Sequence, residues 1–241
     1  MQDRSRPTLT SLDNHLLEAL PANVRERMDG ALERFRLPLR ASLYEPGDEV
    51  AHVYFPVDAV ISVVTVMRDG DHIEALTIGR EGVIGAGALL DTTPVSQLTF
   101  CQVGGDAYRM GLQRFGELCG TSHALRALIQ RYLGAQIDVM AQSIACNRLH
   151  HVGERCARWI LMTHDRVGRD EFTLTHESLA AMLGVRRAGV SVAAERLQRL
   201  GAIRYRRGRV SVADRAVLEH EACECYGAIS DSYTRRRLPA G

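Results

Sequence analysis

The sequence predicts an α+β fold with three parts: an N-terminal domain of short antiparallel strands, one long helix, and a small helical domain that ends in a charged hairpin. The first observation is that residues 37–112 are short runs rich in Val, Ile, Thr, Tyr and Phe, separated by turns such as Glu45-Pro46-Gly47-Asp48. That texture is typical of an antiparallel sandwich or barrel. The second is that apolar residues recur at helical spacing from about residue 121 onward.

The composition limits the class of protein. With 241 residues and 46% hydrophobic content, the chain has room for one large domain or two modest ones. No apolar run approaches the roughly 20 residues that span a bilayer, and the N-terminus lacks the apolar segment of a signal peptide. We therefore expect a soluble, cytoplasmic protein with no membrane partner. Six scattered cysteines in mostly apolar segments suit reduced core residues rather than a disulfide framework.

The charge is distributed unevenly along the chain, and every basic residue is arginine. Residues 1–149 carry 14 arginines against 18 acidic residues, whereas residues 150–241 carry 16 against 11. Within 186–209 there are eight arginines and one acid. Such a concentrated basic segment favours a polyanionic partner, although charge runs often only solvate a face.

The strand domain and the long helix follow in order. Residues 11–36 predict one or two short helices, the second beginning at Pro21, and with the strands they form a domain over 1–120. A long helix is expected at roughly 121–147, within a segment 121–148. It carries a narrow apolar seam at spacings of 4, 3 and 4: Leu133, Ile137, Met140 and Ile144. A narrow seam favours pairing with the same helix of a second chain; packing against the strand domain is the alternative, and Gly134 interrupts the seam.

A helix-turn-helix is predicted after a second helix at about 150–165. Thr175 is a good N-cap for a two-turn helix, and Gly184 can adopt the left-handed conformation that ends it. On the following helix a buried face is expected from apolar residues at helical spacing: Val190, Ala193, Leu197 and Leu200.

The opposite side of this helix is expected to be exposed. Counting 100° per residue places Ala188, Ser191, Val192, Glu195 and Arg199 there, with Arg187 at the margin. The N-terminal half of such a helix enters the major groove of DNA, where arginine can pair with guanine. We predict that Arg187 contacts a base edge, together with Ala188, Ser191 and Val192, whereas Arg186, on the inward side, holds a phosphate. An ordinary αα-hairpin with a solvated basic edge is the alternative.

A basic hairpin follows the second helix and favours DNA binding over that alternative. After Gly201 the sequence AIRYRRGRVSVAD predicts strand, turn and strand, with the turn at Arg206-Arg207-Gly208-Arg209. A charged hairpin at this place is typical of a wing, so Arg207 and Arg209 are expected on phosphates. The predicted DNA-binding domain covers 149–226, and 227–241 is left as a tail whose end, TRRRLPAG, looks disordered.

A β-roll, a long seam helix and a winged helix-turn-helix, in this order over residues 14–226, resemble the Crp/Fnr superfamily of bacterial transcription regulators. The most specific stretches are LYEPGDEVAHVYFPVDAVISV and LTHESLAAMLGVRRAGVSVAAERLQRLGAI. The resemblance implies a cyclic-nucleotide-binding-like sensor domain, a homodimer along the long helix, an inverted-repeat operator in double-stranded DNA, and contact with RNA polymerase.

The chain departs from this family at three places. Where members that bind cyclic AMP hold its phosphate, the glutamate position falls on Ala86 and the arginine position near Ser96, and no basic residue lies between Arg80 and Arg109. Cyclic AMP therefore would lack its charged partner, and the effector is an unidentified small molecule or none. No cysteine precedes Cys101, so the N-terminal iron–sulfur sensor is absent. Ala188 and Val192 replace a glutamate and an arginine, so the usual family half-site is not expected.

Other candidate sites give weaker signals. Cys223-Glu-Cys225 could be a redox pair or half of a metal site, and His150-His151, near Cys146 and Cys156, could ligate a metal, but packing and capping also explain them. Haem ligation by His52 or His72 has no motif behind it. We therefore predict no metal and no cofactor. The chain has none of the common catalytic motifs, so we expect no enzyme. The competing function is a small-ligand-binding module whose basic C-terminal domain does not read DNA sequence.

Overall fold

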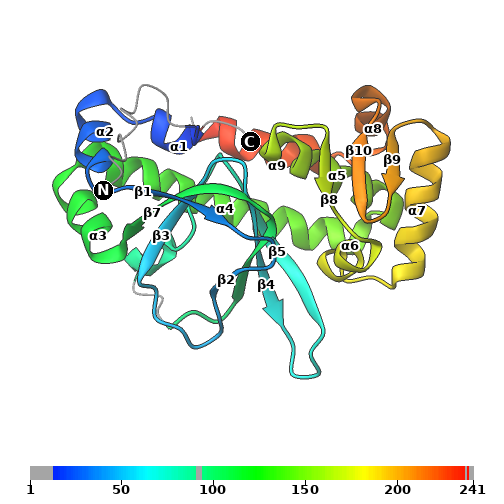
Figure 1. Cartoon of the computed structure of the whole chain (residues 1–241), viewed down its shortest axis with the longest axis horizontal. Helices are drawn as coiled ribbons and strands as arrows, with labels where there is room; N and C mark the ends of the chain where they lie inside the picture. Colours follow the sequence, from blue (N-terminus) through cyan, green and yellow to red (C-terminus); the bar gives the residue numbers. More distant parts are fainter. Residues whose placement is uncertain (1–12, 91–93, 237, 239–241) are drawn as a thin grey trace, which may run out of the picture.

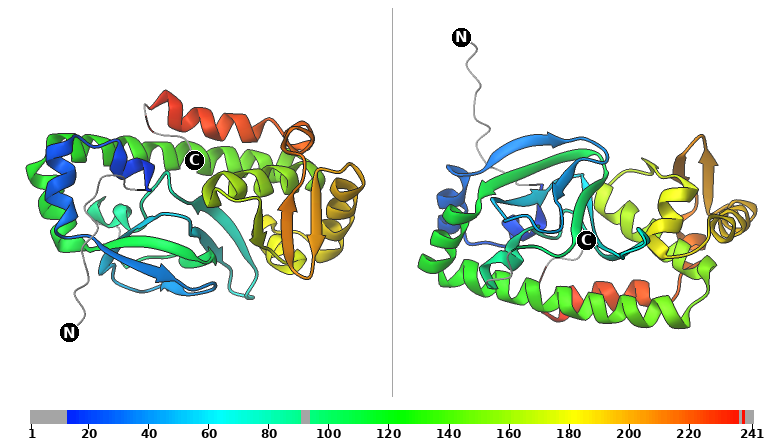
Figure 2. Two further views of the ribbon diagram at one scale, coloured as in Figure 1. Left: turned by 45° about the horizontal axis from the view of Figure 1, so that its top comes forward. Right: turned by 90° about the horizontal axis from the view of Figure 1, so that it is seen from below.

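One long helix, α4 (His123–Leu149), extends along both halves of the molecule. In the computed structural model, which describes residues 13–90, 94–236 and 238, this helix runs beneath both halves of the chain. The strand-rich half lies along its N-terminal part and the helix-turn-helix half lies near its C-terminal end (Figures 1 and 2). The order predicted from the sequence is therefore confirmed.

Two short helices come before the strands, as expected. They are α1 (His15–Glu18) and α2 (Ala22–Asp29), with Pro21 at the N-cap of α2. Asn14 caps α1 through its Oδ1, which accepts from the Leu17 amide at 3.1 Å, while its amide group donates to carbonyls of the strand domain. The expected helical range 11–36 is too long at its end, because β1 (Glu33–Leu37) begins there; residues 11 and 12 lie outside the described residues.

Two antiparallel sheets make up the β-roll. One has the order β1-β7-β3, with β3 at His52–Pro56 and β7 at Gly105–Gly111. The other has the order β2-β6-β4-β5, with β2 at Ser42–Tyr44, β4 at Val60–Val66, β5 at His72–Ile78 and β6 at Leu98–Val103. Apolar side chains fill the space between the sheets, with Ile61, Cys101 and Ala107 fully buried. A 3₁₀ turn, η1 (Ala86–Leu90), lies between β5 and β6.

A helix that the sequence analysis did not anticipate, α3 (Leu112–Thr121), links the roll to α4. It packs Phe115 and Leu118 into the main core of the roll. The Ser122 hydroxyl then accepts from the Leu125 amide and caps α4. The long helix therefore begins and ends two residues later than the expected 121–147, which is within the usual uncertainty of helix ends.

The C-terminal half is a winged helix-turn-helix. Helix α5 (Val152–Val167) supplies its core with Trp159, Ile160 and Leu161, and β8-β10-β9 form a small antiparallel sheet. The remaining elements are β8 (Glu171–Thr173), α6 (His176–Leu183), α7 (Arg187–Arg199), β9 (Ile203–Arg206), β10 (Arg209–Val212) and α8 (Arg215–Glu221). Strand β8, which is only three residues long, and α8 were not anticipated.

The chain ends in a helix where the sequence analysis left a tail. Helix α9 (Cys225–Arg235) lies alongside α4 (Figure 2, left). Its Ile229 and Tyr233 are buried in the same core as α4, and Arg236 forms an ion pair with Asp138 of α4 at 2.8 Å. The spacing of Tyr226, Ile229 and Tyr233 is that of an amphipathic helix, so the signal was present in the sequence. Residues 237 and 239–241 lie outside the described part.

Within the described residues, no helix combines the length and the apolar character that crossing a membrane requires.

Candidate nucleic-acid interface

The turn between α6 and α7 has the caps that the sequence predicts. The Thr175 hydroxyl accepts from the Ser178 amide at 3.0 Å and caps α6. Gly184 ends that helix at φ 61°, a left-handed conformation that favours glycine. The Val185 amide then donates to the Ala180 carbonyl at 3.0 Å. These bonds fix the angle at which α7 leaves α6.

The inner face of α7 is nearly as predicted. Val190, Ala193 and Leu197 are buried in the core of the C-terminal half, and Ala194 joins them. Leu200 was expected on this face, but it is 45% exposed. The reason is its place at the C-cap, where Gly201 at φ 77° turns the chain away from the helix. Helical periodicity therefore no longer applies to Leu200.

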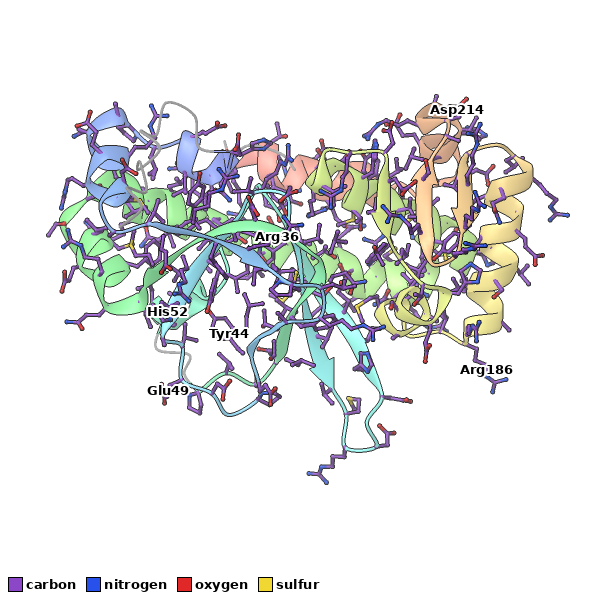
Figure 3. The ribbon with its side chains drawn as sticks, viewed as in Figure 1. Arg36, Tyr44, Glu49, His52, Arg186 and Asp214 are labelled. Carbon is purple, nitrogen blue, oxygen red and sulfur yellow. The ribbon has the colours of Figure 1, made fainter. Side chains whose placement is uncertain are left out.

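The outer face of α7 presents the predicted side chains to solvent at its N-terminal end. Arg187, Ala188 and Val192 are exposed, Val192 by 66%. Arg186 is the N-cap of α7 and is also exposed; its side chain extends away from the body of the protein (Figure 3). The expectation that Arg186 points inward is therefore wrong, because it precedes the first helical turn and its extended backbone does not follow the wheel.

Ser191 is held within the domain rather than free. Its hydroxyl lies 3.0 Å from Nδ1 of His176 and donates to the Arg187 carbonyl at 3.2 Å. The His176 ring packs edge-on against Tyr205 of β9, with centroids 4.6 Å apart. A chain of contacts thus joins α6, α7 and the wing. His176 and Tyr205 were missed from the sequence, because their spacing along the chain carries no signal of this contact.

The electrostatics of this chain of contacts keep His176 neutral. Burial, and then the positive charge of Arg187, lower the pKa of His176 below its usual value. Its Nε2 is buried without a hydrogen-bond partner among the described residues. Because Ser191 donates its one hydroxyl proton to the Arg187 carbonyl, the neutral ring donates from Nδ1 to the Ser191 hydroxyl oxygen. The contact therefore positions the N-terminal half of α7 without adding charge to it.

The wing is a tight hairpin with arginines at its tip. Arg207 and Gly208 have φ of 47° and 75°, so both central residues of the turn are left-handed, as in a type I′ hairpin. Arg209 forms an ion pair with Glu171 of β8 at 2.5 Å, and both side chains are more than half exposed. Arg209 is therefore paired within the protein, but an exposed pair of this kind is weak and readily exchanged.

The exposed arginines of α7 and the wing form one basic surface. A groove between the start of α6, α7 and the wing is lined by Thr175, His176, Glu177, Arg187, Tyr205 and Gly208. The exposed arginines of α7 and the wing are Arg186, Arg187, Arg196, Arg199, Arg204, Arg206, Arg207 and Arg209, of which Arg196 pairs with Glu221 and Arg209 with Glu171. Their summed field attracts a polyanion to the end of the molecule that presents α7.

The sequence of this region matches a family model described as a Crp-like helix-turn-helix domain, over residues 154–221. The helix-turn-helix and its wing therefore resemble a Crp-like helix-turn-helix domain, and this segment is called the Crp-like domain below. The match runs from α5 through the wing to the end of α8, so the basic surface lies inside the Crp-like domain. A comparison with curated proteins finds no match.

Solved structures extend the likeness of fold beyond the Crp-like domain. A CRP-family transcriptional regulator of Thermus thermophilus, TTHB099, is 24% identical, with TM-score 0.64, covering 78% of this chain and 96% of its own. FixK2 of Bradyrhizobium japonicum is 14% identical, with TM-score 0.67 and coverage of 80% and 98%. The c-di-GMP-responsive global regulator CLP of Xanthomonas campestris is 16% identical, with TM-score 0.63 and coverage of 80% and 100%. The chain therefore has the Crp/Fnr fold, with a cyclic-nucleotide-binding-like roll before the Crp-like domain.

The four residues of the α4 seam differ in exposure. Ile137 and Ile144 are 63% and 73% exposed, which leaves an apolar stripe without cover on the single chain. Met140 is half-buried between them. Leu133 is also half-buried, but it packs against the core of its own roll. The alternative of packing against the chain's own domain therefore holds for Leu133, and Ile137 and Ile144 remain available to a partner.

Tyr44 packs close to Ala86, one of the two residues at which the resemblance places the family's phosphate contacts. Ala86 is buried at the start of η1, and Ser96 is exposed before β6. Tyr44 lies against Gly85 and donates its hydroxyl to the His52 carbonyl. Gly85 has φ 85°, and a Cβ there would meet the Tyr44 hydroxyl at 2.5 Å. The tyrosine thus packs against the backbone next to the 3₁₀ turn.

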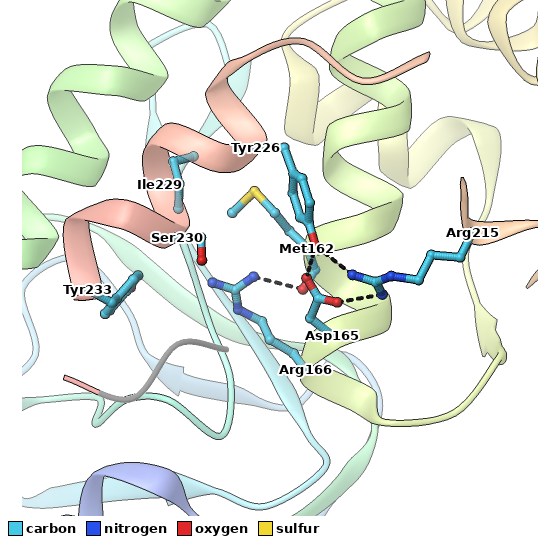
Figure 4. Close-up of a pocket in the computed structure, with 8 residues that line it drawn as sticks. All are labelled: Met162, Asp165, Arg166, Arg215, Tyr226, Ile229, Ser230 and Tyr233. Carbon is cyan, nitrogen blue, oxygen red and sulfur yellow. Dashed lines mark hydrogen bonds and ion pairs between the residues drawn. The ribbon is translucent and has the colours of Figure 1, made fainter. Parts of the chain in front are cut away.

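A polar pocket lies between α5, α8 and α9 (Figure 4). Its polar groups satisfy one another: Asp165 accepts from Arg215 at 2.7 Å and from the Tyr226 hydroxyl at 2.8 Å. Arg166 donates to the Met162 carbonyl at 2.7 Å. These bonds attach α8 and α9 to α5, which gives the pocket a structural role in the Crp-like domain.

Proposed function

We propose that this chain is a homodimeric, sequence-specific DNA-binding transcription regulator. The observation that carries the proposal is the basic surface of the Crp-like domain, where the exposed N-terminal half of α7 stands next to an arginine-tipped wing. A helix of this exposure fits the major groove, and a hairpin beside it can reach the backbone. The structural likeness to TTHB099, which is named a transcriptional regulator, and to CLP, which is named a global regulator, supports the same function.

The proposed roles follow from position on that surface. Arg187 reads a base edge, because it stands on the exposed first turn of α7 and guanine offers arginine two acceptors. Ala188 and Val192 offer apolar contacts that suit thymine methyl groups. Arg186, Arg207 and Arg209 bind phosphates; Arg209 leaves Glu171 to do so. Ser191 contributes mainly by holding α7 against His176.

Dimerisation is supported by the uncovered apolar stripe at Ile137 and Ile144. Covering apolar surface stabilises association by about 25 cal/mol per Å². A two-fold dimer through α4 carries two copies of α7, and such a reader binds an inverted repeat with half-sites roughly 34–36 Å apart. We expect RNA polymerase to be the protein partner at the promoter, and the cytoplasm to be the place of action.

The regulator is proposed to act without cyclic AMP and without an iron–sulfur cluster. The support is the buried Ala86, the exposed Ser96, and the lack of any basic residue between Arg80 and Arg109. An unpaired phosphate in this roll would lose a charge-assisted hydrogen bond. A different small molecule remains the proposed effector class, if the roll has an effector at all.

Selection of DNA sites from a random library by the purified full-length chain tests the proposal. We expect an enriched inverted repeat, bound by one dimer with an affinity that falls steeply as salt rises. A parallel selection with Arg187→Ala separates reading from charge, because its wing stays intact. Recovery of unselected DNA by the unmodified chain, with equal affinity for all sequences, would reject the reader. It would favour the alternative of a ligand-binding module with an incidental basic end.

A further inference from the structure

Four potential metal ligands meet at the junction between α4, α5 and α9. Cys146 comes from the last turns of α4, and His150 from the residues between α4 and α5. Cys223 comes from the connection between α8 and α9, and Cys225 is the first residue of α9. One ligand atom from each of the four lies within 4.8 Å of all the others. The two weak cysteine and histidine signals of the sequence are therefore parts of one cluster.

The distances inside this cluster suit a single tetrahedral ion. Sγ of Cys146 lies 3.6 Å from Sγ of Cys223, and Nδ1 of His150 lies 3.5 Å from Sγ of Cys225. Around Zn²⁺, bonds of ~2.3 Å to sulfur and ~2.0 Å to nitrogen at tetrahedral angles give separations of about 3.8 Å between two sulfurs and about 3.5 Å between sulfur and nitrogen. An iron–sulfur cluster places its own iron and sulfide atoms between the ligands and needs a wider opening.

The thiols are buried apart from the hydrophobic cores. Cys146 and Cys225 are fully buried and Cys223 is nearly so, and the three form a separate small group. His150 is only half-buried, which gives an ion a way in. Three thiols that face each other gain little as apolar packing, whereas Cys₃His is a common structural zinc set. His151 is different: it caps α5 and lies outside the cluster.

The surroundings orient the ligands as a metal site requires. With Nδ1 of His150 facing the thiols, its Nε2 lies 3.7 Å from a carboxylate oxygen of Glu224. Metal-bound histidines usually donate their second ring nitrogen to such a group. The amide of Gln142 donates to Sγ of Cys225 at 3.0 Å. Cys225 is also the first residue of α9, where the helix dipole favours a thiolate.

Charge balance supplies an independent observation. Arg155 and Arg158 are buried, and neither forms an ion pair with a carboxylate among the described residues. The Nε of each also lacks a hydrogen-bond partner there. The charge of Arg158 acts on Cys146 and Cys223, and also on the buried carboxyl group of Glu74. One Zn²⁺ with three thiolates and a neutral imidazole carries a net charge of −1, which offsets a buried guanidinium.

We propose that Cys146, His150, Cys223 and Cys225 bind one structural zinc ion. The three thiols lose their protons to solvent as the three sulfur–zinc bonds form, and His150 binds through Nδ1 with its proton on Nε2. The ion ties the α8–α9 connection to the junction between α4 and α5. It therefore fixes the Crp-like domain to the long helix at the point where the two halves of the chain meet.

Metal analysis of the full-length chain tests this inference. Protein purified under reducing conditions and dialysed against ZnCl₂ should hold one zinc per chain. Co²⁺ in place of Zn²⁺ should give the thiolate charge-transfer and d–d absorption bands of a tetrahedral site. Chelation should lower the thermal midpoint by several degrees while the far-ultraviolet circular dichroism at low temperature keeps its helical shape.

Neighbouring histidines offer a matched pair of variants. His150→Asn should lose the tetrahedral cobalt spectrum and bind zinc at least tenfold more weakly, while His151→Asn, which keeps a capping side chain, should behave as the unmodified chain. Cys119→Ser removes a thiol outside the cluster, in the core of the roll. This variant should keep the tetrahedral cobalt spectrum, which shows that loss of a thiol elsewhere does not affect metal binding.

Three results would overturn the proposal. The first is a reduced, folded chain that takes up no zinc. The second is an intact mass showing a Cys146–Cys223 disulfide that persists as the native form. The third is bound iron with acid-labile sulfide in place of zinc.

Discussion

The guanidinium of Arg166 and the carboxylate of Glu81 form a buried ion pair between the two halves of the chain. Nη2 and Nε of Arg166 lie 2.8 Å and 2.9 Å from Oε1 of Glu81, and the side chains are 4% and 0% exposed. The pair joins α5 to the turn that follows β5. Gly79 in that turn has no alternative, because a Cβ there would lie 2.4 Å from the Arg166 side chain.

The first prediction concerns this pair. Arg166→Met should lower the free energy of unfolding by about 3–5 kcal/mol, because it leaves Glu81 buried without its counter-ion. Arg166→Met with Glu81→Leu should recover most of that loss. Urea titration measures both. Arg169→Met is the control: it breaks a half-exposed pair with Asp58 at 2.8 Å and should cost at most about 1 kcal/mol. Equal losses from Arg166→Met and Arg169→Met would contradict the argument.

The second prediction separates the arginines of the basic surface. Arg187→Ala should cost about 1–3 kcal/mol on the selected site and relax the preference at one base pair of each half-site. Arg207→Ala should weaken binding to all DNA alike and reduce the salt slope by about one. Fluorescence anisotropy with specific and scrambled duplexes at several salt concentrations measures both.

Arg209→Ala needs separate treatment because Arg209 is paired with Glu171. Arg209→Ala should weaken binding to all DNA, as Arg207→Ala does, but by less. The reason is that Arg209 must break its ion pair with Glu171 before it can bind a phosphate, and this cost reduces the net gain from the phosphate contact. Glu171→Gln should accordingly raise the affinity for all DNA. If Arg187→Ala keeps its sequence preference and loses affinity uniformly, Arg187 is a backbone contact, and reading passes to Ala188 and Val192.

The third prediction concerns the apolar stripe of α4. Ile137→Glu should convert a dimer to a monomer, because it places a charge within surface that association buries. Arg131→Glu changes charge on an exposed residue of the same helix away from the stripe and should stay dimeric. Sedimentation velocity at micromolar concentration decides. If the unmodified chain is a monomer at that concentration, the prediction that the apolar stripe of α4 forms a dimer interface is wrong.

The fourth prediction is that neither cyclic AMP nor cyclic GMP binds the roll. Calorimetry at millimolar nucleotide should detect no heat of binding, since the phosphate would meet no basic residue between Arg80 and Arg109. The tyrosine contact with Gly85 restricts the same region. Tight binding of either nucleotide would show that another part of the roll supplies the missing charge.

The sequence predicted elements whose apolar pattern is long or whose ends carry a cap. Thr175 and Gly184 fixed the helix-turn-helix because their effects are local. The sequence-based prediction was wrong where the structure of a short segment depends on a contact or a turn involving only a few residues. Strand β8 is recognisable only from its pairing with β10. The exposure of Leu200 is set by the turn that follows it at the end of α7. Arg186 was misplaced because periodicity does not apply before a first helical turn.

The candidate site shows the same division. The exposed face of α7 follows from periodicity, so Arg187, Ala188 and Val192 were predictable. His176 and Ser191 are 15 residues apart, and their bond depends on the angle between two helices, which no sequence pattern encodes. The four potential ligands, Cys146, His150, Cys223 and Cys225, are brought together by the packing of α9 on α4, and Cys146 and Cys225 are 79 residues apart in the sequence. Each half of that cluster gives only a weak signal alone.

The last prediction uses His176 to test how α7 is held. Because burial and the charge of Arg187 lower the pKa of His176 in the folded chain, protonation favours the unfolded state. Above the unfolded pKa of about 6.5 the ring is neutral in both states, and the stability it contributes is fully present. As the pH falls through 6.5 the unfolded chain takes up a proton first, so that stability is lost until the folded ring also protonates.

Between pH 7.5 and 5.5 the unmodified chain should therefore lose more free energy of unfolding than His176→Gln. Arg187→Gln should reduce the loss, since it removes the second cause of the lowered pKa. Urea titrations at the two pH values measure this difference. If His176→Gln shows the same loss as the unmodified chain, the ring is not held neutral between α7 and the wing.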